Sequence, residues 1–120
     1  VLNGNVHLAK SKLRQAIKLA ENAKAPAQDL CLLYGKLGNL CRDQGSFAEA
    51  ADYYENAVNT ARSAGLNAEL AEYLDYLALC RLETGALDQA LANGNESLKL
   101  KLSLYGENHF FTSNILQKLG

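Results

Sequence analysis

The sequence predicts an all-α fold, an α-α superhelix of antiparallel helix pairs, mainly because segments recur after about forty residues. Segment 34–41, followed by 45–50, returns as 74–81 followed by 85–90, with large and small side chains in the same order. A glycine, Gly45 or Gly85, is also the first residue of the second segment in each copy. Self-similarity at this period is typical of helical units that bury their apolar faces against neighbouring copies.

One slot of the repeat requires a small side chain. Gly38, Ala78 and Gly120 occupy it at intervals of forty and forty-two residues, each after a pair of large apolar residues. Ala50 and Ala90 provide a second small position in the other helix of each unit. Two helices can cross closely only where side chains are this small, so we expect these residues at the helix crossings.

The first predicted helix, residues 5–24, repeats the second helix of a later unit. Small and apolar residues near the N-terminus have the spacing seen after Gly45. These residues are Gly4, Val6, Ala9, Leu13 and Ala16. The next helix is predicted at residues 26–44, because Pro26 suits the first turn of a helix.

The third helix is predicted at residues 47–64. Gly45 interrupts the chain just before it, and Ser46 with Glu49 has the spacing of a capping box. We therefore expect the Ser46 side chain to cap this helix.

Gly65 followed by Leu66 is typical of a helix stop with an apolar contact behind it. Asn67 is able to cap the helix that follows, and Gly85 and Gly106 separate the later ones. The remaining helices are predicted at residues 67–84, 87–105 and 109–119.

The first complete unit resembles the tetratricopeptide repeat family. That family's pattern runs large-x2-Leu-Gly/Ala-x2-large and then Gly-x-aromatic-x2-Ala-x3-aromatic-x2-Ala. The matching residues are Tyr34, Leu37, Gly38, Gly45, Phe47, Ala50, Tyr54 and Ala57. The family's basic unit has thirty-four residues, so the longer spacing here resembles its long-repeat branch and implies helices about one turn longer.

Residues 104–109, Leu-Tyr-Gly-Glu-Asn-His, are similar to the Leu-Gly-Glu-Asp-His-Pro joint between kinesin light chain repeats, with Phe110 in place of the proline. We predict one domain over residues 1–120, with partial units at both ends. The units are 1–24 (a second helix), 25–65, 66–106 and 107–120 (a first helix). Because both termini fall inside units, we expect flanking repeats or end-to-end self-association.

Composition and charge favour a soluble, cytoplasmic protein with no membrane partner. The hydrophobic content is 48%, the formal net charge is −1, and no apolar run is long enough to cross a bilayer. Basic residues gather in residues 1–24 and acidic residues in 43–96. A nucleic-acid contact at the basic helix is the alternative to a solvated face. We predict no nucleic-acid binding, because no aromatic residues for base stacking are interleaved there.

The residues that could carry catalysis are scattered. Cys31 and Cys41 lie about 15 Å apart along one predicted helix, too far for a shared metal or a disulfide. Neither they nor Cys80 form a Cys-x-x-Cys or Cys/His pattern, so we expect buried thiols. His7 and His109 are far apart in the array. We therefore predict a protein that is not an enzyme and has no cofactor and no metal.

The solenoid geometry places a binding surface on the concave side, which the first helix of each unit lines. The exposed residues expected there come from the two complete units and the last partial one. They are Lys36, Asn39, Arg42, Asp43, Glu72, Asp75, Tyr76, Leu79, Asn114, Gln117 and Lys118. We predict a peptide with a basic residue facing Asp75 and an apolar residue against Tyr76 and Leu79.

The family resemblance implies a protein–protein interaction module that acts as a scaffold or adaptor. Members that grip a C-terminal carboxylate use Lys, Asn and Arg at such slots, and Lys36 with Asn39 partly resembles that clamp, whereas Glu72 and Asp75 would repel a carboxylate. The alternative is a peptide-sensing regulatory domain that controls an attached output domain.

Gly94 departs from the repeat, because it stands where Tyr54 and Leu13 stand in the other copies. Glycine inside a helix costs about 1 kcal/mol relative to alanine. Two readings stay open. Either a bulky neighbour such as Phe110 or Phe111 fills the space, or a pocket or hinge lies between the last two units.

Overall fold

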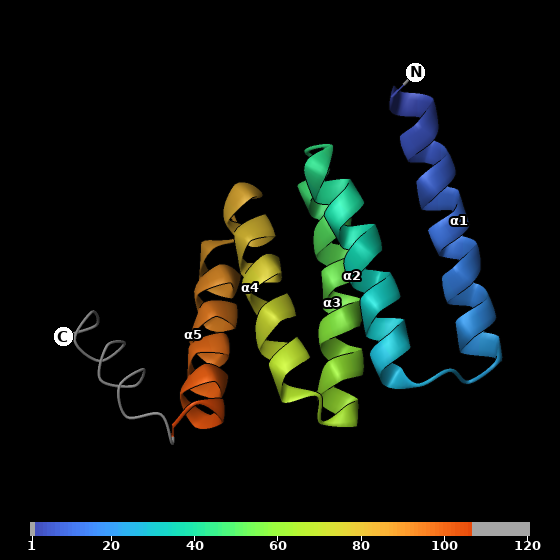
Figure 1. Cartoon of the computed structure of the whole chain (residues 1–120). Coiled ribbons are helices and arrows are strands. Elements are labelled where there is room, and N and C mark those ends of the chain that lie inside the picture. The colour runs from blue at the N-terminus through green and yellow to red at the C-terminus, as the bar shows by residue number, and fades with distance from the viewer. Residues whose placement is uncertain (1, 107–120) are drawn as a thin grey trace.

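The computed structural model describes residues 2–106, with side chains from residue 4 onward, and this part of the chain contains five helices and no strand. The helices stand side by side in sequence order, as Figure 1 shows. Their bounds are α1 (Leu2–Asn22), α2 (Ala27–Asp43), α3 (Phe47–Ala64), α4 (Asn67–Glu83) and α5 (Leu87–Leu104). The all-α prediction is confirmed.

The predicted helix bounds agree with the structure to within three residues. α3 begins and ends at the predicted residues, whereas α1 begins three residues earlier than predicted. α4 and α5 also begin at the predicted residues, and the remaining bounds differ by one or two residues. The helix predicted at residues 109–119 lies outside the described residues.

Three glycines in the left-handed conformation set the turns between helices. Gly45, Gly65 and Gly85 have φ of 78°, 71° and 83°, values that residues with a Cβ rarely adopt. After each glycine, the next N–H donates to a carbonyl five residues back, at 2.8 to 2.9 Å. This is the Schellman arrangement, which ends a helix and directs the chain into the next one.

The two side-chain caps predicted at helix starts are wrong. Ser46 is the N-cap of α3, but its side chain makes no capping hydrogen bond. Leu66, not Asn67, is the N-cap of α4, and Asn67 is already helical. Gly45 and Gly65, which precede these N-cap residues, set the backbone conformation of the two turns. α3 and α4 therefore start without a side-chain cap.

Adjacent helices run antiparallel, and α2 with α3 and α4 with α5 form two hairpins, as the front and rear views show. α4 packs against α3 of the preceding hairpin and also touches α2 directly. First helices α2 and α4 therefore meet on one side of the array, and we call the surface they line the inner face. The molecule measures 47 × 33 × 24 Å.

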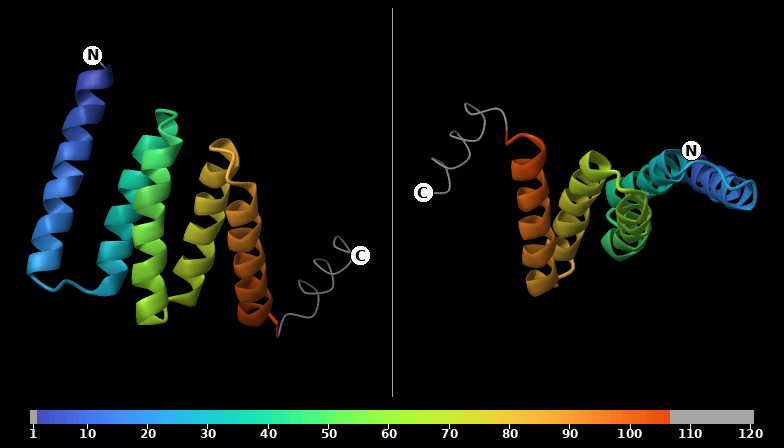
Figure 2. Two further views of the ribbon diagram at one scale, coloured as in Figure 1. Left: turned by 180° about the vertical axis from the view of Figure 1, so that it is seen from behind. Right: turned by 90° about the horizontal axis from the view of Figure 1, so that it is seen from below.

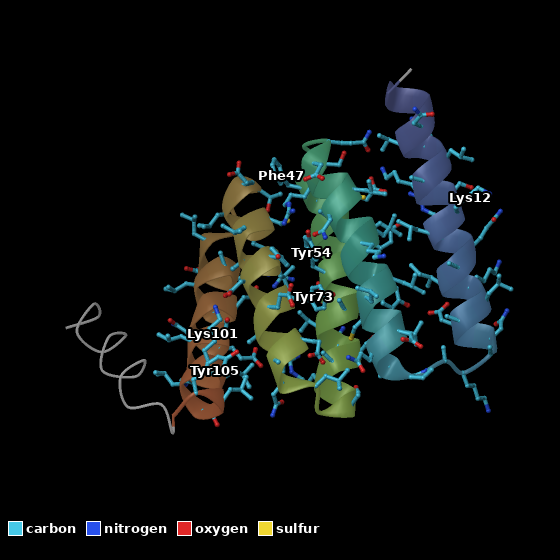
Figure 3. The ribbon with its side chains drawn as sticks, in the orientation of Figure 1. Lys12, Phe47, Tyr54, Tyr73, Lys101 and Tyr105 are labelled. Carbon is cyan, nitrogen blue, oxygen red and sulfur yellow. The ribbon has the colours of Figure 1, made fainter. Side chains whose placement is uncertain are left out.

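The core lies where these helices cross, and tyrosine rings fill it. Tyr54 of α3 is fully buried, and its ring lies 6.4 Å from that of Tyr73 on α4. Figure 3 shows both tyrosines in the middle of the array. Gly38 and Ala50 are buried beside them, as predicted for small residues at the crossings. Ala90 is also buried, whereas Ala78 is only partly buried and Gly120 lies outside the described residues.

Candidate functional site

The inner face has an upper hollow between α1 and α2, with a volume of about 290 Å³. Lys36, Asn39 and Asp43 line it, and Leu13 and Leu40 form its apolar wall. These three polar residues come from one side of α2, because they follow each other at spacings of three and four. The structure therefore brings three of the predicted site residues together.

Asn39 is only partly available to a ligand. Its side-chain oxygen accepts a hydrogen bond from the hydroxyl of the buried Tyr54. Lys36 is exposed and has no ion-pair partner within residues 4–106. A ligand carboxylate in this hollow would meet one free ammonium group.

Arg42 and Tyr76 form a stack that spans α2 and α4. The guanidinium carbon of Arg42 lies 5.0 Å from the centre of the Tyr76 ring, a cation–π geometry. The same ring stacks on Tyr54, 5.4 Å away, and meets the Tyr73 ring at 6.3 Å in a tilted arrangement. Tyr76 is thus partly engaged within the chain, and its contact with an apolar residue of a peptide stays a prediction. Leu79 is 53% exposed and remains accessible.

Asp75 is engaged within the chain. Lys101 of α5 donates to its carboxylate at 2.5 Å, so the charge that was expected to face a ligand is already neutralised. Both residues line a hollow of about 300 Å³ between α4 and α5, beside Leu104 and Tyr105. Lys101 and Tyr105 lie together near the end of α5 in Figure 3. The prediction that Asp75 meets a basic residue of the peptide is therefore not supported.

A second hollow of the inner face, the lower hollow, lies between the first turns of α2 and α4 and has a volume of about 300 Å³. Three carboxylates and several apolar side chains line it. Its lining residues are Gln28, Asp29, Cys31, Leu32, Glu69, Glu72 and Tyr73. Within the described part of the chain, none of its three carboxylates takes part in an ion pair. Leu32, which also lines the hollow, is 51% exposed.

Sequence reasoning named only Glu72 among these residues. The missed residues Asp29, Leu32 and Glu69 continue the same helix faces toward the N-terminus, at the i+3 and i+4 spacings that lead to Lys36 and Glu72. Continuing these two series of positions by one or two turns toward the start of each helix would have identified them.

Burial favours the protonated forms of the Tyr73 hydroxyl and the Cys31 thiol, which line the lower hollow. It raises the pKa of Tyr73 to about 12, with Glu72 adding to the effect. Burial also raises the pKa of the Cys31 thiol, which donates to the carbonyl of Ala57 at 3.4 Å. The lower hollow therefore presents carboxylates and apolar surface at neutral pH rather than a reactive thiolate.

Other site expectations have mixed outcomes. Asn114, Gln117 and Lys118 lie outside the described residues. Two cations of the basic helix, Lys10 and Arg14, pair with Glu49 of α3, at 3.4 and 3.0 Å. Part of the basic charge is therefore used to hold α1 against α3 rather than left for nucleic acid.

Cys31, Cys41 and Cys80 are all buried and unpaired, as expected for core thiols. In residues 2–106 no three His, Cys, Asp or Glu side chains gather closely enough to hold a metal ion. Across the same residues, every helix is too short or too polar to cross a bilayer.

Comparisons with known proteins agree with the fold. A model of the tetratricopeptide repeat family matches residues 28–103. Five solved chains match, and one of them is the crystal structure of BtubC (BKLC) from P. vanneervenii. The two chains are 26% identical with a TM-score of 0.76, over 88% of this chain and 42% of that one. This chain thus spans less than half of that protein's length. A search of curated proteins found no match.

Proposed function

Because the chain belongs to the tetratricopeptide repeat family, whose repeats generally mediate protein–protein interactions, we propose that its inner face binds a peptide segment of a partner protein. The protein then acts as a non-catalytic scaffold or adaptor. Three buried thiols fit the reducing conditions of the cytoplasm, which is the location we propose.

The observation that carries the proposal is the lower hollow. Asp29, Glu69 and Glu72 line it together with the exposed Leu32, and the three carboxylates have no ion-pair partner in the described chain. Uncompensated charge beside an apolar anchor suits a ligand of opposite charge, because complementary potentials set specificity and the rate of encounter. We assign this hollow to a basic residue of the peptide beside an apolar one.

The upper hollow suggests how the peptide continues. Lys36 is the exposed cation on the same face of α2, one turn beyond Leu32. A peptide that lies along α2 from Leu32 toward Asn39 therefore passes from acidic to basic surroundings. We propose that a basic residue of the ligand sits in the lower hollow and that an acidic group sits near Lys36.

The test uses two fluorescein-labelled synthetic peptides, one with leucine between two arginines and a following glutamate, and the other with glutamates in place of the arginines. Glu72→Lys should weaken binding of the arginine peptide at least tenfold. Asp52→Lys is the matched control, since Asp52 is exposed on α3, has no ion pair in the described residues and gives the same change in net charge. We expect it to change the affinity less than twofold.

Fluorescence anisotropy at several salt concentrations measures the effect. Equal losses in Glu72→Lys and Asp52→Lys would mean that overall charge, and not the lower hollow, attracts the peptide. Equal affinity of the wild type for both peptides would also refute the assignment.

A further inference from the structure

An apolar groove, which we call the Gly94 groove, lies between α4 and α5 and has a volume of about 410 Å³. It is separate from the inner-face hollows. Its lining residues are Ala78, Leu82, Leu87, Ala90, Leu91, Gly94 and Asn95. All except Asn95 are apolar, and the three leucines are each more than half exposed, Leu91 the most at 66%. A Cβ built on Gly94 would find no described atom within 4 Å.

The preceding repeat shows what normally fills this place. Forty residues earlier, Tyr54 holds the position of Gly94, and its ring packs against Gly38. α4 covers that seam and leaves Tyr54 with no exposed surface. The Gly94 groove is the same seam one repeat further on, without the tyrosine ring. An aromatic ring therefore fits the position in the earlier repeat, whereas in this one no atom of residues 4–106 takes its place beside Gly94.

We propose that the Gly94 groove is a second docking site, which takes a bulky apolar side chain from an amphipathic helix of a partner protein. The partner helix would lie across α4 and α5 as α4 lies across α2 and α3. Its side chain would enter at Gly94 and occupy the volume that the Tyr54 ring occupies in the earlier repeat.

The residues around the groove define the chemistry of that side chain. In the earlier repeat the Tyr54 hydroxyl donates to Asn39, and the position equivalent to Asn39 here is Leu79. A phenol in the Gly94 groove would lose that acceptor, so a phenylalanine-like or leucine-like side chain fits better. Glu83 and Asp88 are exposed, flank the groove in sequence and have no ion pair among the described residues. They favour basic residues at the ends of the partner helix.

The test uses the full chain and a synthetic stapled helix with one central phenylalanine, alanines on the same face and lysines at both ends. Wild-type protein and Gly94→Ala should bind it, because one methyl group leaves most of the groove open. Gly94→Tyr restores the ring of the earlier repeat and should weaken binding at least tenfold without lowering the melting temperature. Replacing the peptide's phenylalanine by alanine should weaken binding to a similar degree.

A second measurement does not depend on any groove variant. The methyl resonances of Ala78 and Ala90 should shift when the peptide is added to the wild type, and Glu72→Lys should leave these shifts unchanged, which separates this site from the inner face. Unchanged binding by Gly94→Tyr, or no shift in the wild type, would overturn the proposal.

The Ile115→Asp/Leu116→Asp double variant of the full chain identifies a competing occupant. If the peptide binds this variant but not the wild type, the chain's own residues 109–119 occupy the groove, and the proposal is overturned.

Discussion

The ring of Tyr54 lies so close to Gly38 that a Cβ on the glycine would come within 2.8 Å of the ring edge. The ring has no room to withdraw, because it is fully buried and its hydroxyl donates to Asn39. Gly38 therefore allows α2, α3 and α4 to meet around one aromatic ring.

Gly38→Ala should destabilise the protein, although alanine favours helix by about 1 kcal/mol over glycine. Overpacking a core of this kind costs roughly 1–3 kcal/mol, so we expect a net loss. Gly94→Ala is the matched control, since its Cβ meets no described atom within 4 Å, and it should gain up to about 1 kcal/mol. Urea unfolding of both variants measures the difference. A gain in stability for both would contradict the close packing at Gly38.

The repeat made most of the fold predictable from the sequence. Gly45, Gly65 and Gly85 mark the ends of α2, α3 and α4 at intervals of twenty residues, so these three boundaries were indicated by a residue that has a positive φ. The caps were not predictable in this way. Ser46 has the right side chain and spacing, but the backbone conformation that the preceding glycine sets leaves that side chain without a capping hydrogen bond.

Arg81 joins three helices and should contribute more to stability than other exposed cations. It donates to Glu55 of α3 at 2.9 Å and to Asn93 of α5 at 2.7 Å. Its side chain is 19% exposed, so solvent screens these bonds only in part. We expect Arg81→Met to cost about 1.5–3 kcal/mol, the range for hydrogen bonds to a charged group.

The matched control is Arg62→Met. Arg62 pairs with Glu96 at 2.7 Å, but both side chains are well exposed, and exposed pairs contribute about 0–1 kcal/mol. Thermal unfolding of the two variants compares them. A larger loss of stability in Arg62→Met than in Arg81→Met would show that the bonds of Arg81 to α3 and α5 are not a main source of stability.

The candidate site was predictable only in outline. The sequence indicated the helix faces, but it did not show that Asp75 is neutralised by Lys101, a residue 26 positions away on the next helix. One repeat earlier the equivalent positions hold Gly35 and Ala61. Reading the two replacements together would have indicated a pair, because an acid and a base appear at positions that both hold small residues in the other copy.

The three cysteines should resist thiol reagents while the protein is folded. Cys31, Cys41 and Cys80 are almost completely buried, and burial raises the pKa of each thiol above its ordinary value. The thiolate is the reactive form, so both access and ionisation are suppressed. At pH 8 we expect Ellman's reagent to label the native protein only as fast as it unfolds. In urea all three thiols should react. Rapid labelling of one thiol in the native state would show that its part of the core opens locally.

Stability should fall at alkaline pH because buried phenols and thiols hold their protons in the folded state. Burial raises the pKa of Tyr34 and Tyr73 to about 12, against an ordinary value of 10, and Tyr34 also donates to Glu21 at 2.7 Å. In the unfolded chain the thiols ionise near pH 9 and the phenols near pH 10, so above these values the unfolded state binds fewer protons. The free energy of unfolding should therefore be flat from pH 7 to 8.5 and decrease from about pH 9 to 12, at up to 1.36 kcal/mol per pH unit for each proton retained.

Urea unfolding across this range measures the slope, and Tyr34→Phe should make it shallower between pH 10 and 12, because one of the phenols that retain a proton is then absent. A free energy that stays constant up to pH 11 would mean that these hydroxyls ionise equally well in the folded chain, and thus that the tyrosine core is open to water.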